Sequence, residues 1–182
     1  VSGKGMSAAL LSVIIGGMES IYNFNYGIEN FLISLNEYIF NSFQAEKFIT
    51  GVFIDFDENT GELSLYDVGH SYFYIFRKNK FIKAKTKINT VPIGITQDFL
   101  PEKIKFKLQP DDILILITDG IEEQKNSQGE EYGIKNVQNV FKNNPSVNIT
   151  EIKDILFQDI RDFRKSQSQH DDMTLIFLQY HG

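Results

Sequence analysis

The order of the expected secondary-structure elements predicts an α+β domain in which helices cover antiparallel strands. Helical spacing of apolar residues opens the chain, strand patterns fill its middle, and helical spacing returns before one last strand. Some strands are almost wholly apolar, so they need cover on both faces. Layers of helices on antiparallel sheets satisfy that need, and a chain of 182 residues is long enough to bury one such core.

Two helices are expected before the strands. The first follows a turn at Gly3 and Gly5 and is apolar on opposite faces, so we expect it to be buried on most sides. Its apolar positions are Met6, Ala9, Leu10, Val13 and Gly17 on one face and Ala8, Leu11 and Ile14 on the other. The second covers about residues 27–43 and has a single apolar stripe for the core, with Asn36 outside that stripe.

An antiparallel meander is expected next, because short apolar runs are separated by turn residues. Its strands are residues 48–56, 63–68, 72–76 and 81–84. Residues 103–108 then alternate charged and apolar side chains, as a half-exposed strand does, whereas residues 113–117 read ILILI and predict a central strand.

The last third of the chain predicts two helices and one closing strand. The helices cover about residues 134–141 and 149–163, and Asn148 is the expected N-cap of the second. Residues 174–180 form the last strand.

The composition narrows the class of function. A net charge of -6 argues against nucleic-acid binding, which needs clustered Lys and Arg. The absence of cysteine removes disulfides, thiolate zinc sites and cysteine nucleophiles, and it fits a reducing, cytoplasmic setting. No apolar run is long enough to span a bilayer and no signal sequence opens the chain, so we expect a soluble domain that does not insert into membranes.

One acidic residue stands at the end of the ILILI strand. Asp119 follows that strand after a single Thr and precedes Gly120, so a carboxylate emerges where the backbone can turn sharply beside a ligand. A metal ligand is one interpretation, and the N-cap of a helix from Ile121 onward is the other.

A second acidic feature precedes the last strand. Asp171 and Asp172 stand where a polar loop enters the core, and they are interpreted either as metal ligands or as a solvated turn. Asp111 and Asp112, an equally acidic pair before a strand, are explained by a turn. Carboxylates without a histidine cluster favour Mg²⁺ or Mn²⁺. Two-metal hydrolysis is therefore the leading enzymatic class.

Six short segments, taken in their order and spacing, resemble one known family. They are VSGKGMSAALL at 1–11, YDVGH at 66–70, VPIG at 91–94, TDGIEEQKN at 118–126, EEYG at 130–133 and DDMTL at 171–175. The set resembles the metal-dependent protein phosphatase (PPM) family, in its bacterial SpoIIE-like and RsbU-like branch. The resemblance covers the whole chain, so residues 1–182 are expected to be a single phosphatase domain.

The resemblance implies an αββα four-layer sandwich of two antiparallel sheets flanked by helices, with two Mn²⁺ or Mg²⁺ ions at one edge. It implies that Asp119 and Asp171 are catalytic, metal-binding carboxylates and that the backbone carbonyl of Val1 is a further ligand. Residues that would shape the site or meet the substrate are Ser2, Gly3, Lys4, Gly5, Gly120 and Asp172.

The sequence departs from the family at its start. Because it begins at Val1 on a Gly-rich turn, we expect the natural protein to continue upstream, where the family carries an acidic hairpin and an Asp directly before Val1. We therefore expect these 182 residues alone to bind metal poorly and to have negligible activity. Uncovered sheet edges would favour a homodimer or strand exchange.

The activity that the resemblance implies is hydrolysis of phosphoserine or phosphothreonine on a protein, by in-line attack of a metal-activated water. In this branch the substrate is typically an anti-sigma-factor antagonist with a STAS fold, and an upstream sensor regulates the enzyme. The domain is then cytoplasmic, whether alone or as the cytoplasmic module of a membrane-bound sensor. The alternatives are a non-catalytic signalling module that keeps the fold and a hydrolase of small phosphoesters.

Two further features have open interpretations. His70, in the YDVGH segment, is either a proton donor to a leaving group or, as we favour, a residue that fixes a turn. Glu122 and Glu123 either support the site from behind Asp119 or form the acidic first turn of a helix.

Overall fold

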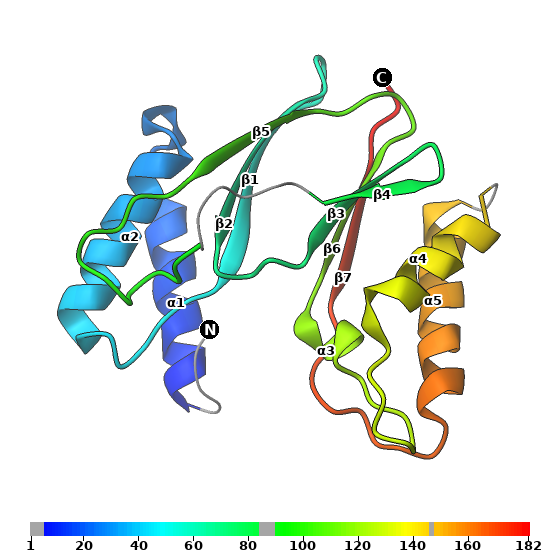
Figure 1. Cartoon of the computed structure of the whole chain (residues 1–182). Helices are drawn as coiled ribbons and strands as arrows, with labels where there is room; N and C mark the ends of the chain where they lie inside the picture. The colour runs from blue at the N-terminus through cyan, green and yellow to red at the C-terminus, as the bar shows by residue number, and fades with distance from the viewer. Residues whose placement is uncertain (1–5, 84–89, 146–147) are drawn as a thin grey trace. The chain divides into compact units, whose positions relative to one another are not determined.

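The computed structural model describes residues 6–83, 90–145 and 148–182. These residues form two compact units, the first from the described parts of Val1–Ser71 and Lys85–Lys107 and the second from those of Tyr72–Ala84 and Leu108–Gly182. Each unit has one antiparallel sheet with helices beside it (Figure 1). The predicted α+β class with two antiparallel sheets and flanking helices is therefore confirmed.

The first unit contains two long helices and a three-stranded sheet. Its elements are α1 (Met6–Ile21), the 3₁₀ turn η1 (Phe24–Tyr26), α2 (Ile28–Phe43), β1 (Gly51–Asp57), β2 (Glu62–Val68) and β5 (Lys103–Lys107). β2 lies between β1 and β5, and the register pairs Tyr66 with Phe53 on one side and with Lys103 on the other. The strand that alternates charged and apolar residues thus borders the described sheet.

Helix α2 supplies four of the ten buried residues in the core cluster of the first unit. Its fully buried side chains pack with residues of β2, as the predicted apolar stripe requires. They are Phe31, Leu32, Leu35 and Ile39. Asn36 was predicted to lie outside this stripe, and that prediction is wrong because the side chain is buried: its amide donates to the carbonyl oxygen of Thr96 at 2.9 Å and accepts from the Gly94 N–H at 2.8 Å.

Helix α1 is less buried than its sequence predicts. Leu11 is 1% exposed, but Met6, Leu10 and Val13 on the other side of the helix are 77%, 56% and 72% exposed. The expectation of burial on most sides is therefore wrong, because the described part of the unit packs against one side of α1 only. None of the described helices is both long and apolar enough to cross a membrane.

The second unit contains a four-stranded sheet and three helices. Its elements are β3 (Phe73–Arg77), β4 (Lys80–Ile82), β6 (Ile113–Ile117), α3 (Asp119–Glu122), α4 (Gly133–Asn143), α5 (Ile149–Arg164) and β7 (Leu175–Gln179). The strand order is β4-β3-β6-β7, so the ILILI strand β6 is central, as predicted. The predicted meander is wrong at one point, because β2 and β3 follow each other in sequence but belong to different sheets.

Helices α4 and α5 complete the second core. Val137 and Phe141 of α4 and Leu156 of α5 are fully buried in one cluster with the apolar side chains of β6. The predicted N-cap of α5 is confirmed, since the Asn148 side chain accepts the N–H groups of Thr150 and Glu151, both at 3.0 Å.

An ion pair between half-buried Arg77 and buried Asp112 ties β3 to the start of β6. The Arg77 guanidinium donates from Nε and Nη2 to the Asp112 carboxylate at 2.5–3.0 Å, and Asp112 also accepts the Gln109 N–H at 2.7 Å. Asp112 is 1% exposed, so its charge depends on these donors. The interpretation of Asp112 as a simple turn residue missed this pairing.

Replacing Asp112 by Ala should lower the free energy of unfolding by about 3 kcal/mol, because it leaves the guanidinium without its buried partner. Urea denaturation followed by circular dichroism measures this loss. The matched control is Asp154→Ala, which breaks the exposed Lys153–Asp154 pair and should cost less than about 1 kcal/mol. Equal losses in the two variants would contradict a special role for the Arg77–Asp112 pair.

Candidate functional site

Asp119 opens helix α3 directly after the central strand of the second unit. The N-cap is Thr118, in an extended conformation, and the exposed Asp119 carboxylate accepts the Gly120 N–H at 2.9 Å. The alternative interpretation of Asp119 as the N-cap is therefore wrong. In Figure 1, α3 lies at the end of β6, beside the segment that leads into β7.

Gly120 brings the backbone of α3 against the second acidic segment. A Cβ atom built on Gly120 would overlap the carbonyl oxygen of Asp172 and lie 3.2 Å from that of Asp171. Backbone carbonyls cannot move aside as a flexible side chain can, so this close approach requires glycine. The structure thus places the Asp119–Gly120 turn and Asp171–Asp172, which are about fifty residues apart in the chain, in direct contact.

Thr118 and Thr174 fix this contact from the strand side. The Thr118 N–H donates to the carbonyl of Thr174 at 3.1 Å, and the Thr118 hydroxyl donates to the carbonyl of Asp172 at 3.1 Å. The same hydroxyl oxygen accepts the Thr174 N–H at 2.8 Å. The end of β6 and the start of β7 are therefore held in register up to the acidic residues.

Gln124 holds the loop on the other side. The side chain is 1% exposed, its amide donates to the carbonyls of Lys125 and Ser168, and its oxygen accepts the His170 N–H at 3.2 Å. These hydrogen bonds join the loop before Asp171 to the segment that follows α3. Sequence reasoning missed Gln124, because nothing local marks a glutamine in an acidic and polar segment as buried.

Two tyrosines of the β3 region hold the acidic face of α3. The Tyr74 hydroxyl donates to Glu122 at 2.5 Å, and the Tyr72 hydroxyl donates to Glu123 at 3.5 Å. Burial, followed by the bond to Glu122, raises the pKa of Tyr74 far above its usual range, so this hydroxyl stays protonated. Glu122 lies in the acidic first turn of α3, as one of the two interpretations held, and Glu123 is the C-cap of that helix. Support of a metal site by these two residues stays a prediction.

The carboxylates of Asp119, Asp171 and Asp172 are suited to a hard cation. All three residues are exposed, and the Asp171 carboxylate accepts the Asp172 N–H at 2.8 Å. Oxygen donors of this kind fit Mg²⁺ or Mn²⁺. Within the described residues, no group of three or more His, Cys, Asp or Glu side chains is arranged to hold a metal ion.

The other predicted site residues have no described position. Val1, Ser2, Gly3, Lys4 and Gly5 lie outside the described residues. Their assignment as a carbonyl ligand and as site-shaping or substrate-binding residues stays a prediction.

The YDVGH and VPIG segments meet in the first unit. The buried Asp67 carboxylate accepts the N–H groups of His70 and Ser71 at 2.8 and 3.1 Å and the Thr90 hydroxyl at 3.3 Å. Gly69, at φ +80°, leaves no room for a Cβ beside Pro92. These contacts favour the interpretation that this motif fixes a turn.

A match to a family model identifies the family of this chain. Residues 1–181 match the family model "Stage II sporulation protein E (SpoIIE)". The chain belongs to the SpoIIE family. The resemblance found in the sequence motifs is thereby confirmed.

A curated relative shows the likeness in sequence, and two solved structures show a likeness in fold alone. The chain is 27% identical to the phosphoserine phosphatase RsbU of Bacillus subtilis over 98% of its own length and 53% of RsbU, so it spans about half the length of that relative. The PP2C domain of SiaA from Pseudomonas aeruginosa aligns with a TM-score of 0.81 at 16% identity, over 98% of this chain and 72% of that one. The manganese-presoaked phosphatase domain of Bacillus subtilis SpoIIE aligns with a TM-score of 0.59 at 21% identity, over 98% and 75%.

Replacing Gly120 by Ala should destabilise the second unit by about 1–3 kcal/mol, because the new methyl group meets backbone carbonyls that must shift. The matched control is Gly16→Ala in α1, where a Cβ meets nothing within 4 Å and helix propensity favours Ala by about 0.5–1 kcal/mol. Thermal unfolding of both variants compares the effects. An unchanged midpoint for Gly120→Ala would contradict the close approach.

Replacing Tyr74 by Phe should cost about 1.5–3 kcal/mol, because Glu122 loses a hydroxyl donor in a partly buried place. Hydrogen exchange of the amides of α3 should speed up in the same variant. Tyr38→Phe on the exposed side of α2 is the control and should stay within about 0.5 kcal/mol of the parent protein. If exchange in α3 did not change, the tyrosine would not be holding this helix.

Proposed function

We propose that this chain is the catalytic part of a metal-dependent protein serine/threonine phosphatase. The observation that carries the proposal is the packing of Gly120 on the backbone of Asp171 and Asp172, which brings the carboxylate-bearing turns of a SpoIIE-family chain together. The likeness to RsbU, a phosphoserine phosphatase, supports the same activity.

The proposed metal is Mn²⁺ or Mg²⁺, held by Asp119 and Asp171, with the carbonyl of Val1 as a further ligand. The two carboxylates fit this role because they are exposed oxygen donors on a turn that Thr118, Gln124 and Gly120 fix in place. Bound ions of this kind would supply an activated water and stabilise the charge on the phosphoryl oxygens. We also propose that residues outside this sequence complete a site for two ions.

The chain's own residues would position these donors. Thr118 and Gln124 hold the two acidic turns, and the Tyr74–Glu122 bond holds α3. Asp172 contributes through its carbonyl, which receives the Thr118 hydroxyl, and is proposed to shape the site. Ser2, Gly3, Lys4 and Gly5 are proposed to line it, with Lys4 as a point charge for the substrate phosphate.

The proposed substrate is a phosphoserine or phosphothreonine on a signalling protein, in particular an anti-sigma-factor antagonist with a STAS fold. The family match and the likeness to RsbU support this choice. We further propose that the domain works in the cytoplasm as a homodimer under the control of an upstream sensor. The absence of cysteine fits a reducing compartment.

A non-catalytic signalling module is the second candidate. It is favoured by one observation, that the described residues contain no group of three side chains able to hold a metal. Such a module would keep the fold and bind a partner without hydrolysis.

The deciding experiment measures phosphate release from a phosphoserine protein in Mn²⁺, using the natural full-length protein. We expect turnover that falls by about 10²-fold or more in Asp119→Asn and in Asp171→Asn, because each loses a carboxylate charge needed for the metals. Asp154→Asn, an exposed change on α5, is the control and should keep full activity.

The 182 residues alone should show negligible turnover in the same assay. A folded full-length protein that binds Mn²⁺ but releases no phosphate would favour the signalling module. Robust turnover by the 182 residues alone would contradict the proposal that the metal site needs residues outside this sequence.

A further inference from the structure

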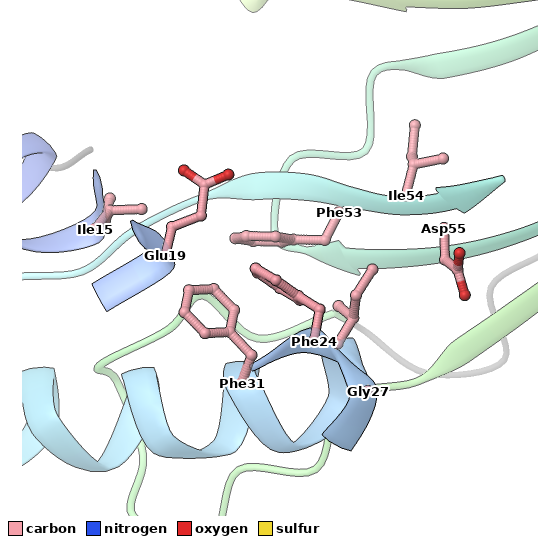
Figure 2. Close-up of a pocket in the computed structure, with 9 residues that line it drawn as sticks. Ile15, Glu19, Phe24, Gly27, Phe31, Phe53, Ile54 and Asp55 are labelled. Atoms are coloured by element: carbon pink, nitrogen blue, oxygen red, sulfur yellow. The ribbon is translucent and has the colours of Figure 1, made fainter. Parts of the chain in front are cut away.

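A pocket of about 440 Å³ opens in the first unit. It lies among α1, η1, the start of α2 and β1. Figure 2 shows Phe24, Phe31 and Phe53 grouped together, with the carboxylates of Glu19 and Asp55 on opposite sides of the aromatic group. An apolar hollow with a few polar groups at its margin is the usual form of a binding pocket.

The aromatic wall of this pocket is preformed. Phe31 is 1% exposed, and its ring packs against those of Phe24 and Phe53 with centroids 5.5 and 6.1 Å apart. Tyr22 adds an edge-on contact to both Phe24 and Phe31, with centroids 5.1 Å apart in each case. Because these rings fix one another, an apolar group could enter without first ordering the wall.

Residues close to Phe24 in the sequence are also apolar and exposed. Phe24 is 46% exposed, and its neighbours Ile21 and Tyr26 are 85% and 69% exposed. Large exposed side chains gathered around a hollow are typical of a surface that binds another protein rather than a small molecule alone.

The charged side chains that line the pocket are both acidic, Glu19 and Asp55. The elements that line it lie within residues 6–57, where the only basic residue is Lys47 and the acidic ones are Glu19, Glu29, Glu37, Glu46, Asp55 and Asp57. The three lysines of β5 belong to the same unit, but β2 separates their strand from β1. A partner that fills the pocket therefore meets carboxylates at its margin, and a positively charged partner is favoured.

We propose that this pocket is a docking site for a basic, amphipathic segment of a partner protein. An apolar side chain of the segment enters between Phe24 and Phe53, and Lys or Arg residues beside it pair with Glu19 and Asp55. An anionic membrane surface would be repelled by the same acids. A second copy of this chain would carry the same acidic residues within 6–57. Two copies that meet through these segments would repel each other, so a second copy is disfavoured as the occupant.

The test measures binding of a fluorescein-labelled synthetic helical peptide of Leu and Lys by fluorescence anisotropy with the full chain. One control peptide carries Glu in place of Lys, and another carries Ser in place of Leu. We expect the Leu/Lys peptide to bind best, because it alone offers both the apolar anchor and the positive charge. Backbone amide NMR should place the largest shift changes in residues 24–28 and 51–55.

Two double variants separate local from general electrostatic attraction. Glu19→Gln/Asp55→Asn should weaken binding by about three- to tenfold, through the loss of two exposed ion pairs. Glu58→Gln/Asp154→Asn removes the same two charges elsewhere and should leave binding unchanged. Phe24→Ala should weaken binding by at least about fivefold, and its partial exposure makes the change compatible with folding, which circular dichroism checks.

Several results would overturn the proposal. They are absence of binding by the Leu/Lys peptide, equal binding of the Glu peptide, equal losses in the two double variants, and shift changes confined to other residues. If sedimentation showed that the chain self-associates and that Phe24→Ala abolishes this association while the peptide does not bind, the occupant would be a second copy instead.

Discussion

Much of the second unit depends on the contact between Gly120 and the carbonyls of Asp171 and Asp172. Hydrogen bonds from Thr118 and Gln124 bracket this contact on its two sides, and the Tyr74–Glu122 bond holds the helix that carries it. The side chains of Asp119 and Asp171 take no part in these bonds, so their exposed carboxylates are left for a ligand. Stability and the proposed chemistry thus use different atoms of the same two turns.

The two units of the chain differ in their cores and in their exposed side chains. In the second unit, α4 and α5 pack with the sheet in one core, and the Arg77–Asp112 ion pair lies at the start of the central strand. The first buries one face of α1 and leaves apolar side chains and acidic residues exposed beside a pocket. Exposed apolar side chains beside a hollow are typical of a surface that binds another protein.

Local patterns predicted most elements, because their signals lie within a few residues. The α2 stripe, the Asn148 cap and the central ILILI strand are examples. Features that depend on partners far away in the sequence were missed. The buried Asn36 amide bonds to the backbone of Gly94 and Thr96. The buried Asp112 carboxylate pairs with Arg77 of another strand. The change of sheet after β2 was also missed, since the turn at Gly69 and Ser71, both at positive φ, has the same composition as a hairpin turn. Asp119 and Asp171 were predicted as a pair from the family motifs, and the described structure adds the backbone contact that joins their turns.

The central claim is that the approach of Gly120 to Asp171 and Asp172 builds the proposed metal site. Its most direct test is a Mn²⁺ titration of the natural full-length protein, followed by electron paramagnetic resonance. The account predicts that Gly120→Ala weakens Mn²⁺ binding by about tenfold or more, as loss of supporting contacts around a metal site does, while Gly16→Ala leaves it unchanged. Equal Mn²⁺ affinity in a folded Gly120→Ala protein and in the parent would contradict the claim.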